Sequence, residues 1–265
     1  MVAPVQSVVQ SPLPPASNDA VPIAATGSAS AGQAVALEDI TFFWPGQIQP
    51  TLCIPSFCLA KGETLFLSGP SGGGKSTLLS LIAGILQPAT GSVYINGTRM
   101  DTLPLSARDA LRGDSIGLIF QQFNLIPHLS MLNNVLLPCR FSAGRALRAT
   151  EIDGSPEQSA QRLLESLGLG RELWDQNVAR LSVGQQQRVA AARALVGSPP
   201  LIMADEPTSA LDSDRRAGFL HILLRQCAEA GSSLLFVSHD AALAGAFARH
   251  VSLAHINRLC EGEKA

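Results

Sequence analysis

The amino-acid sequence predicts an α/β fold, in which a parallel β-sheet is covered by the helices that connect its strands. The first observation is a series of short apolar runs that are typical of buried strands, at residues 65–67, 116–120, 201–204 and 234–237. The second is the helical pattern between the last two of these runs, over about 215–230. Because alternating strands and helices are typical of strand–helix–strand units, we expect the sheet to be parallel.

A third observation predicts a helical insert in this sheet. Between Gln121 and Leu181 the strand-like runs stop, and the pattern becomes helical. Apolar residues recur there at the spacing of one helix face, namely Ala160, Leu163, Leu164 and Leu167. We therefore expect a helical subdomain over about 122–180.

The first 36 residues are expected to form a disordered extension, followed by one domain over 37–265. The extension is rich in Pro, Ala, Ser and Val, its only charge up to Gly32 is Asp19, and no Lys or Arg occurs before Lys61. A secretory signal needs a basic start and an unbroken apolar core, whereas repeated prolines interrupt this segment. The segment is therefore excluded from the prediction of the fold.

Short strands are expected next in the chain, at 36–44 and 56–59, and a turn at 61–63 closes them. A further strand over 93–95 ends in the turn Asn96-Gly97.

The composition limits the classes of function. The formal net charge of -2 and the 15% of charged residues argue against the basic surface of a nucleic-acid-binding protein. No run approaches the roughly 18 apolar residues of a spanning helix, so we expect another chain to cross the membrane if the protein works at one. Five cysteines without metal-ligand spacing indicate reduced thiols in a cytosolic compartment.

A phosphate-binding loop follows the strand at 65–67 and precedes a helix expected over 75–86. Its residues are Gly69, Ser71, Gly72, Gly73, Gly74, Lys75, Ser76 and Thr77. Glycines let successive backbone N–H groups point at phosphates, and the helix adds the positive end of its dipole. Lys75 would reach the β- and γ-phosphates, and the Ser76 hydroxyl would supply an oxygen ligand to Mg²⁺. The loop predicts nucleoside triphosphate binding, but it does not separate a kinase, a GTPase, a motor and a transporter ATPase.

Two carboxylates, Asp205 and Glu206, end the apolar run 201–204. A buried strand would place Asp205 at the edge of the sheet beside the phosphate loop, as a second Mg²⁺ ligand. Glu206 would project differently and could take a proton from a water that attacks the γ-phosphate. Two acidic residues after a strand also fit a solvated turn. The phosphate loop that precedes them in the chain favours the interpretation as an Mg²⁺-binding and catalytic site.

The segment Leu181–Arg188 opens a helix in which Ser182 and Gln185 fit a capping box. A small-residue helix, two prolines and the acidic strand follow it. Together, residues 181–212 resemble the signature and acidic-strand region of ATP-binding cassette (ABC) ATPases, and the resemblance extends over about 37–259. It implies a P-loop NTPase (RecA-like) parallel-sheet core with an antiparallel β subdomain and an α-helical insert.

The resemblance implies roles for residues that no local pattern assigns. Trp44 matches an aromatic that stacks on adenine, Gln121 matches a glutamine that senses Mg²⁺ and the attacking water, and His239 matches a switch histidine at the γ-phosphate. With Glu206, the last two would form the catalytic set. The implied Mg²⁺ ligands are Ser76, Gln121 and Asp205.

The resemblance also implies a dimer in which two ATP molecules lie between two cassettes. Ser182, Gly184 and Gln185 would bind the ATP held by the phosphate loop of the opposite subunit, with a helix N-terminus directed at the anion. Ser209 and Asp212 match the loop that meets its counterpart across a homodimer or a paired cassette. The chain departs from the family at Val183, where Gly is usual, and a β-branched residue narrows the backbone freedom there.

The predicted function is the ATPase subunit of an ABC transporter, which uses ATP and Mg²⁺ and works with integral-membrane permease subunits. The resemblance places it on the cytoplasmic face of a bacterial inner membrane. Residues 121–128 and the short C-terminal part after His239 resemble the lipoprotein-release and macrolide-export group. The alternatives are the ATPase of an amino-acid importer, a cassette ATPase acting on nucleic acid or ribosomes, and an inactive nucleotide-binding module.

Overall fold

The computed structural model describes residues 32–209, 211 and 213–259. Five of its strands form one sheet in the order β6-β7-β8-β3-β9, and every pair of neighbours is parallel. The strands are β3 (Thr64–Ser68), β6 (Ile116–Ile119), β7 (Leu201–Asp205), β8 (Ser233–Ser238) and β9 (Arg249–Ser252). The predicted parallel sheet is therefore confirmed.

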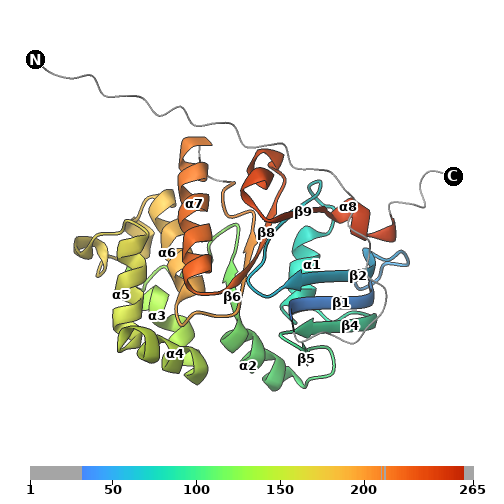
Figure 1. The fold of residues 1–265 in the computed structure, drawn as a ribbon, viewed down its shortest axis with the longest axis horizontal. Coiled ribbons are helices and arrows are strands. Elements are labelled where there is room, and N and C mark those ends of the chain that lie inside the picture. The colour runs from blue at the N-terminus through green and yellow to red at the C-terminus, as the bar shows by residue number, and fades with distance from the viewer. Residues whose placement is uncertain (1–31, 210, 212, 260–265) are drawn as a thin grey trace, which may run out of the picture.

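A second sheet of four strands has the order β2-β1-β4-β5 and is antiparallel. Its strands are β1 (Gln33–Phe42), β2 (Leu52–Ala60), β4 (Thr90–Ile95) and β5 (Thr98–Arg99). Figure 1 shows this sheet, with α1, on one side of the parallel sheet and most of the helices on the other. The antiparallel β subdomain of the predicted fold class is thus present.

Eight α-helices and three short 3₁₀ helices complete the described residues. The α-helices are α1 (Lys75–Ile82), α2 (Leu105–Ser115), α3 (Met131–Phe141), α4 (Ala143–Asp153), α5 (Pro156–Ser166), α6 (Val183–Leu195), α7 (Ser213–Glu229) and α8 (Leu253–Ile256). The 3₁₀ helices are η1 (Arg171–Leu173), η2 (Val178–Arg180) and η3 (Ala241–Ala246). Helices α3, α4 and α5 form the predicted insert between β6 and α6 (Figure 1). None of the helices in the described ranges is long and apolar enough to span a bilayer.

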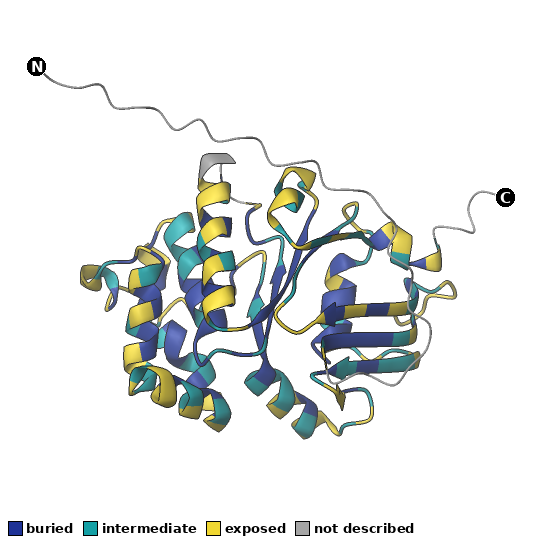
Figure 2. Cartoon of the chain, viewed as in Figure 1, coloured by how far each residue is buried: buried dark blue, intermediate teal, exposed yellow. Residues whose placement is uncertain are grey.

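The parallel sheet separates two hydrophobic cores, because alternate residues of each strand point to opposite faces. Phe66 and Phe236 belong to the core shared with α3, α5, α6 and α7. Leu65 and Leu235, one position before them, belong to the core shared with α1 and the antiparallel sheet. Burying such a side chain stabilises the fold by roughly 1.5–3 kcal/mol. Figure 2 shows the central strand β8 buried along its length.

Several predicted boundaries differ from the structure by a few residues, and two of the differences have a clear structural cause. Helix α1 ends at Ile82 instead of Leu86, because Gly84 has φ +65° and the N–H of Ile85 donates to the carbonyl of Ser80, which closes the helix. Strand β1 begins at Gln33, inside the expected extension of 36 residues, because Val35 and Ala36 already pair with β2. Residues 1–31 lie outside the described residues.

Candidate functional site

The phosphate loop lies between the end of β3 and the start of α1, as predicted. Gly72 and Gly74 have φ +77° and +95°, a left-handed backbone that favours glycine. Gly74 is the residue before the first turn of α1, and a Cβ there would lie 2.9 Å from Cδ2 of Leu52 on β2. Both the turn and the packing on the antiparallel sheet therefore require glycine at this position.

Lys75 is held inside this loop and is 5% exposed. Its Nζ donates to the carbonyls of Gly69 and Pro70 at 3.0 and 2.9 Å. The same nitrogen lies 3.4 Å from Oε1 of Glu206. A phosphate in the loop would therefore meet a buried positive charge and the N-terminal amides of α1 at the same place.

Asp205 and Ser76 form the oxygen-rich part of the site. Asp205 is the last residue of β7, and the Ser76 hydroxyl on α1 hydrogen-bonds its carboxyl group. Burial raises the pKa of Asp205, while the bond to Ser76 and the charge of Lys75 act in the opposite direction. Hydroxyl and carboxylate oxygens are the ligands that Mg²⁺ prefers. In the described residues no three His, Cys, Asp or Glu side chains cluster as a metal cage.

Glu206 follows β7 in a left-handed conformation with φ +45°, which is uncommon for a residue other than glycine. Its N–H donates to the carbonyl of Val237 on β8 at 2.9 Å, and this bond fixes the turn. The turn directs Oε2 of Glu206 to within 2.7 Å of Nδ1 of His239, which follows β8. The structure thus brings Lys75, Glu206 and His239 together from three adjacent parallel strands.

The start of α6 presents a capped helix N-terminus. The Ser182 hydroxyl accepts from the N–H of Gln185 at 3.3 Å, and the Gln185 side chain accepts from the N–H of Ser182 at 2.9 Å. The predicted capping box is therefore confirmed. Val183 is the first helical residue and is half exposed, and the helical backbone suits valine. Gly184 lies next to Leu211, so the start of α6 adjoins the loop of Ser209.

The other predicted site residues lie at the borders of this group. Trp44 is 41% exposed, and its ring meets Phe42 edge-on at 5.3 Å. Phe42 pairs with Leu52, whose side chain lies under Gly74, so Trp44 stands at the end of the antiparallel sheet nearest the phosphate loop. Gln121 is exposed just after β6, Ser71 and Ser76 are exposed, and Thr77 is buried. Asp212 lies outside the described residues.

The comparisons with known proteins address the family. A family model for "ABC transporter" matches residues 53–209. The chain belongs to the ABC transporter family. It is therefore an ABC transporter ATP-binding subunit, with the ATPase activity and nucleotide dependence of that family.

Individual relatives of this ABC subunit agree with the assignment. The uncharacterized ABC transporter ATP-binding protein MJ0796 of Methanocaldococcus jannaschii is 40% identical over 69% of this chain and 76% of that protein. The lipoprotein-releasing system ATP-binding protein LolD of Xanthomonas oryzae pv. oryzae is 40% identical over 77% of this chain and 80% of that protein. A dimeric post-hydrolysis structure of MJ0796 bound to ADP and Pi has a TM-score of 0.72 at 34% identity, covering 82% of this chain and 93% of that one. The P-loop fold class predicted from the sequence is confirmed.

The ABC subunit also contains polar contacts that the sequence patterns did not single out. Gln187 on α6 is 1% exposed and donates to the carbonyl of Pro207, directly after Glu206. Arg216 on α7 donates to the carbonyl of Leu211 and pairs with Asp240, directly after His239. A polar side chain in the apolar face of a helix is the signal that could have indicated the first of these, because such residues are rarely buried without a partner.

Proposed function

We propose that this chain hydrolyses Mg²⁺-bound ATP between two cassettes and couples the closing and opening of this dimer to a separate membrane permease. The observation that carries the proposal is the placement of Glu206 between Lys75 and His239, beside the phosphate loop. A carboxylate held between a phosphate-binding lysine and a histidine is positioned to accept a proton from a water that attacks the γ-phosphate. This is the catalytic role we assign to Glu206.

The residues around it take the remaining roles. Ser76, Asp205 and Gln121 would hold Mg²⁺, which when bound neutralises and orients the β- and γ-phosphate oxygens. Lys75 binds the same phosphates, and His239 contacts the γ-phosphate while it holds Glu206 in place. Trp44 stacks on the adenine, a contact worth roughly 1–3 kcal/mol per base in comparable stacks.

The second half of each nucleotide site comes from another cassette. Ser182, Gly184 and Gln185 form a helix N-terminus, a structure that attracts anions through its free N–H groups and dipole. We assign them to the ATP held by the partner cassette, with Ser209 and Asp212 in the loop that contacts the partner. The dimeric structure of the relative MJ0796 supports this arrangement.

The permease contact has a candidate surface beside Gln121. A groove with a cavity volume of about 320 Å³ lies between β6, α2, α3 and α6, and Phe120 and Asn124 line it. Phe141 at its edge is 85% exposed. An apolar side chain in that position favours a contact with a second protein, and we assign it to a cytoplasmic segment of the permease. The relative LolD supports a system of the lipoprotein-release type.

The substitution Glu206→Gln tests the proposal. Phosphate release should fall by the 10²–10⁴-fold attributed to a general base, while ATP should still be bound, so that light scattering detects a stable ATP-dependent dimer. Glu229→Gln, in an exposed ion pair on α7, is the matched control and should leave turnover unchanged. Lys75→Ala should abolish the dimer by removing nucleotide binding. Undiminished turnover of Glu206→Gln, or turnover per chain that is independent of protein concentration, would contradict the proposal.

A further inference from the structure

The loop that follows Gln121 has a strained backbone. Phe123 and Asn124 are consecutive and have φ +59° and +47°, and neither is glycine. Left-handed residues other than glycine persist only where the surrounding structure imposes them, and two in succession require a specific support. Phe123 is buried and anchors the loop on one side, while Asn124 is exposed, and the carbonyls of both residues can accept hydrogen bonds from partners elsewhere in the chain.

Arg193 on α6 supplies these partners. Its Nη1 donates to the carbonyl of Asn124 at 2.7 Å, and its Nη2 donates to the carbonyl of Phe123 at 2.5 Å. The planar guanidinium thus engages both strained residues at once, in a fork that a lysine cannot reproduce. Burial lowers the pKa of Arg193 below its ordinary value, and the two carbonyls are the polar partners that its partly buried guanidinium has in the loop. The two contacts connect positions 69 and 70 residues apart in the chain.

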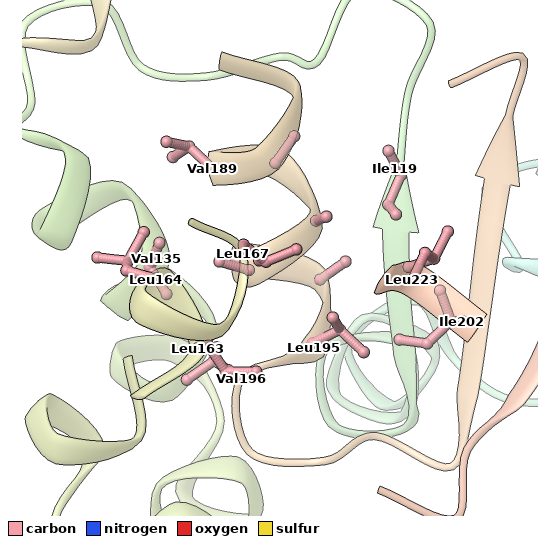
Figure 3. Close-up of a cluster of buried hydrophobic side chains, with 14 of the residues drawn as sticks. Ile119, Val135, Leu163, Leu164, Leu167, Val189, Leu195, Val196, Ile202 and Leu223 are labelled. Carbon is pink, nitrogen blue, oxygen red and sulfur yellow. The ribbon is translucent and has the colours of Figure 1, made fainter. Parts of the chain in front are cut away.

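The helix that carries Arg193 is held firmly on two sides. Figure 3 shows Val189 and Leu195 of α6 between the side chains of the insert helices, such as Leu164, and those of the parallel sheet, such as Ile202. Nearer the N-terminal end of the same helix, Gln187 donates to the carbonyl of Pro207 at 2.7 Å, and Pro207 directly follows Glu206. Helix α6 therefore starts directly after its capping residue Ser182. It contacts two loops, the one that follows Gln121 and the one that follows Glu206.

We propose that Arg193 is a positioning residue that sets the loop of Gln121, and that α6 thereby links the partner's nucleotide to this chain's own Mg²⁺ site. The inference rests on the proposed function, in which the N-terminus of α6 binds the ATP of the partner cassette. A displacement of α6 on dimer closure would move the guanidinium of Arg193. Because the guanidinium is bonded to the carbonyls of Phe123 and Asn124, this movement would also shift Gln121, which lies two positions before Phe123. A nucleotide at one site would then favour the catalytic geometry of the other.

Three variants test this role. Arg193→Lys keeps the charge and most of the stem but loses the fork, and Arg193→Met loses the charge as well. Arg188→Lys is the matched control, because Arg188 lies on the same helix and donates to the single carbonyl of Leu167. Should Arg193→Met fail to fold, the lysine variant alone carries the test.

The first measurement is hydrogen–deuterium exchange of peptides covering 120–126 in nucleotide-free protein. Exchange in Arg193→Lys should be faster by about tenfold or more, since the loop loses its support, while Arg188→Lys should match the wild type. Equal exchange in the wild type, Arg193→Lys and Arg188→Lys would overturn the inference. This measurement does not depend on the ATPase mechanism.

The second measurement is a double-mutant cycle with Gln121→Ala. Arg193→Lys should lower kcat by about tenfold or more and raise the Mg²⁺ concentration needed for half-maximal turnover, whereas in the Gln121→Ala background it should cause no further loss of kcat. An equal loss of kcat in the wild-type and Gln121→Ala backgrounds would show that Arg193 does not act through Gln121 and has only a structural role. Full turnover by Gln121→Ala would instead contradict the proposed function, and the exchange experiment would still decide whether Arg193 holds the loop.

Discussion

Nδ1 of His239 lies 2.7 Å from Oε2 of Glu206, whose other oxygen lies 3.4 Å from Nζ of Lys75. The three side chains differ in accessibility: Lys75 and Glu206 are 6% and 14% exposed, and His239 is 55% exposed. The carboxylate is thus fixed between a buried cation and an imidazole at the surface. Because the imidazole is the outer member, it is the group that can turn toward a phosphate without disturbing the core.

His239→Ala should lower ATP turnover, because it removes both the γ-phosphate contact and the hydrogen bond that orients Glu206. The expected loss is on the order of 10²-fold, the lower end of the range for acid–base groups. Nucleotide affinity should change little, since Lys75 and the loop amides are retained. Phosphate release at saturating ATP measures the effect, with His221→Ala on the exposed side of α7 as the control. Wild-type turnover in His239→Ala would remove this residue from the catalytic set.

Asp205→Asn should increase thermal stability at neutral pH when Mg²⁺ is removed with EDTA. Burial raises the pKa of Asp205 above its ordinary value of 3.8, so the folded chain binds the proton more tightly than the unfolded chain does. The contribution of this group to stability is therefore largest at acid pH and falls as pH rises through the folded-state pKa. At neutral pH the wild type carries a buried charge that the amide avoids.

The measurement is the difference in Tm between Asp205→Asn and the wild type, followed from pH 7 down to pH 4.5. The difference should shrink as the solution becomes more acidic, and Asp175→Asn, at an exposed turn, should show no such trend. The stabilised variant should also lose Mg²⁺-dependent turnover, as expected where a functional group is kept at a cost in stability. A variant less stable than the wild type at pH 7 would show that the bond to Ser76 outweighs burial.

The pair Val183→Gly and Gly184→Val tests the unusual signature sequence. Val183 is half exposed and begins a regular helix, so its side chain does not distort the capped N-terminus. Val183→Gly should therefore leave turnover close to that of the wild type and lower stability by about 0.5–1 kcal/mol, the cost of glycine in a helix. Gly184→Val should instead block the approach of the partner's phosphate and abolish the ATP-dependent dimer, as measured by light scattering in the Glu206→Gln background. A large gain in turnover from Val183→Gly would mean that valine impairs the site.

Local patterns predicted the parts of the molecule that depend on neighbours in sequence. The capping box of Ser182 and the strand that ends in Asp205 are of this kind, because helix caps and strand periodicity act over a few residues. Helix α2 and strand β9 were not predicted: α2 has a largely polar sequence, and β9 is only four residues long. The hydrogen bond from Arg193 to the carbonyl of Phe123 joins residues 70 positions apart, so only the folded chain reveals it.

Arg145 on α4 should be essential for stability, although it lies outside the nucleotide site. It is 2% exposed, and burial lowers its pKa to about 10, so it stays charged at neutral pH. Its guanidinium donates to backbone carbonyls of α2, β6 and the end of α6, namely Gly113, Ile116, Ala194 and Val196. It thereby joins the helical insert to the core through four backbone carbonyls.

Arg145→Met should therefore lower the free energy of unfolding by at least about 3 kcal/mol, because several buried carbonyls lose their donor at once. Arg148→Met is the comparison: Arg148 is on the same helix and also bonds to carbonyls, but its side chain is 30% exposed, so water can satisfy the groups that it leaves. Its loss should stay near 1 kcal/mol or less. Urea denaturation monitored by tryptophan fluorescence gives both values, and equal losses for the two variants would show that burial of the Arg145 contacts is not what stabilises this junction.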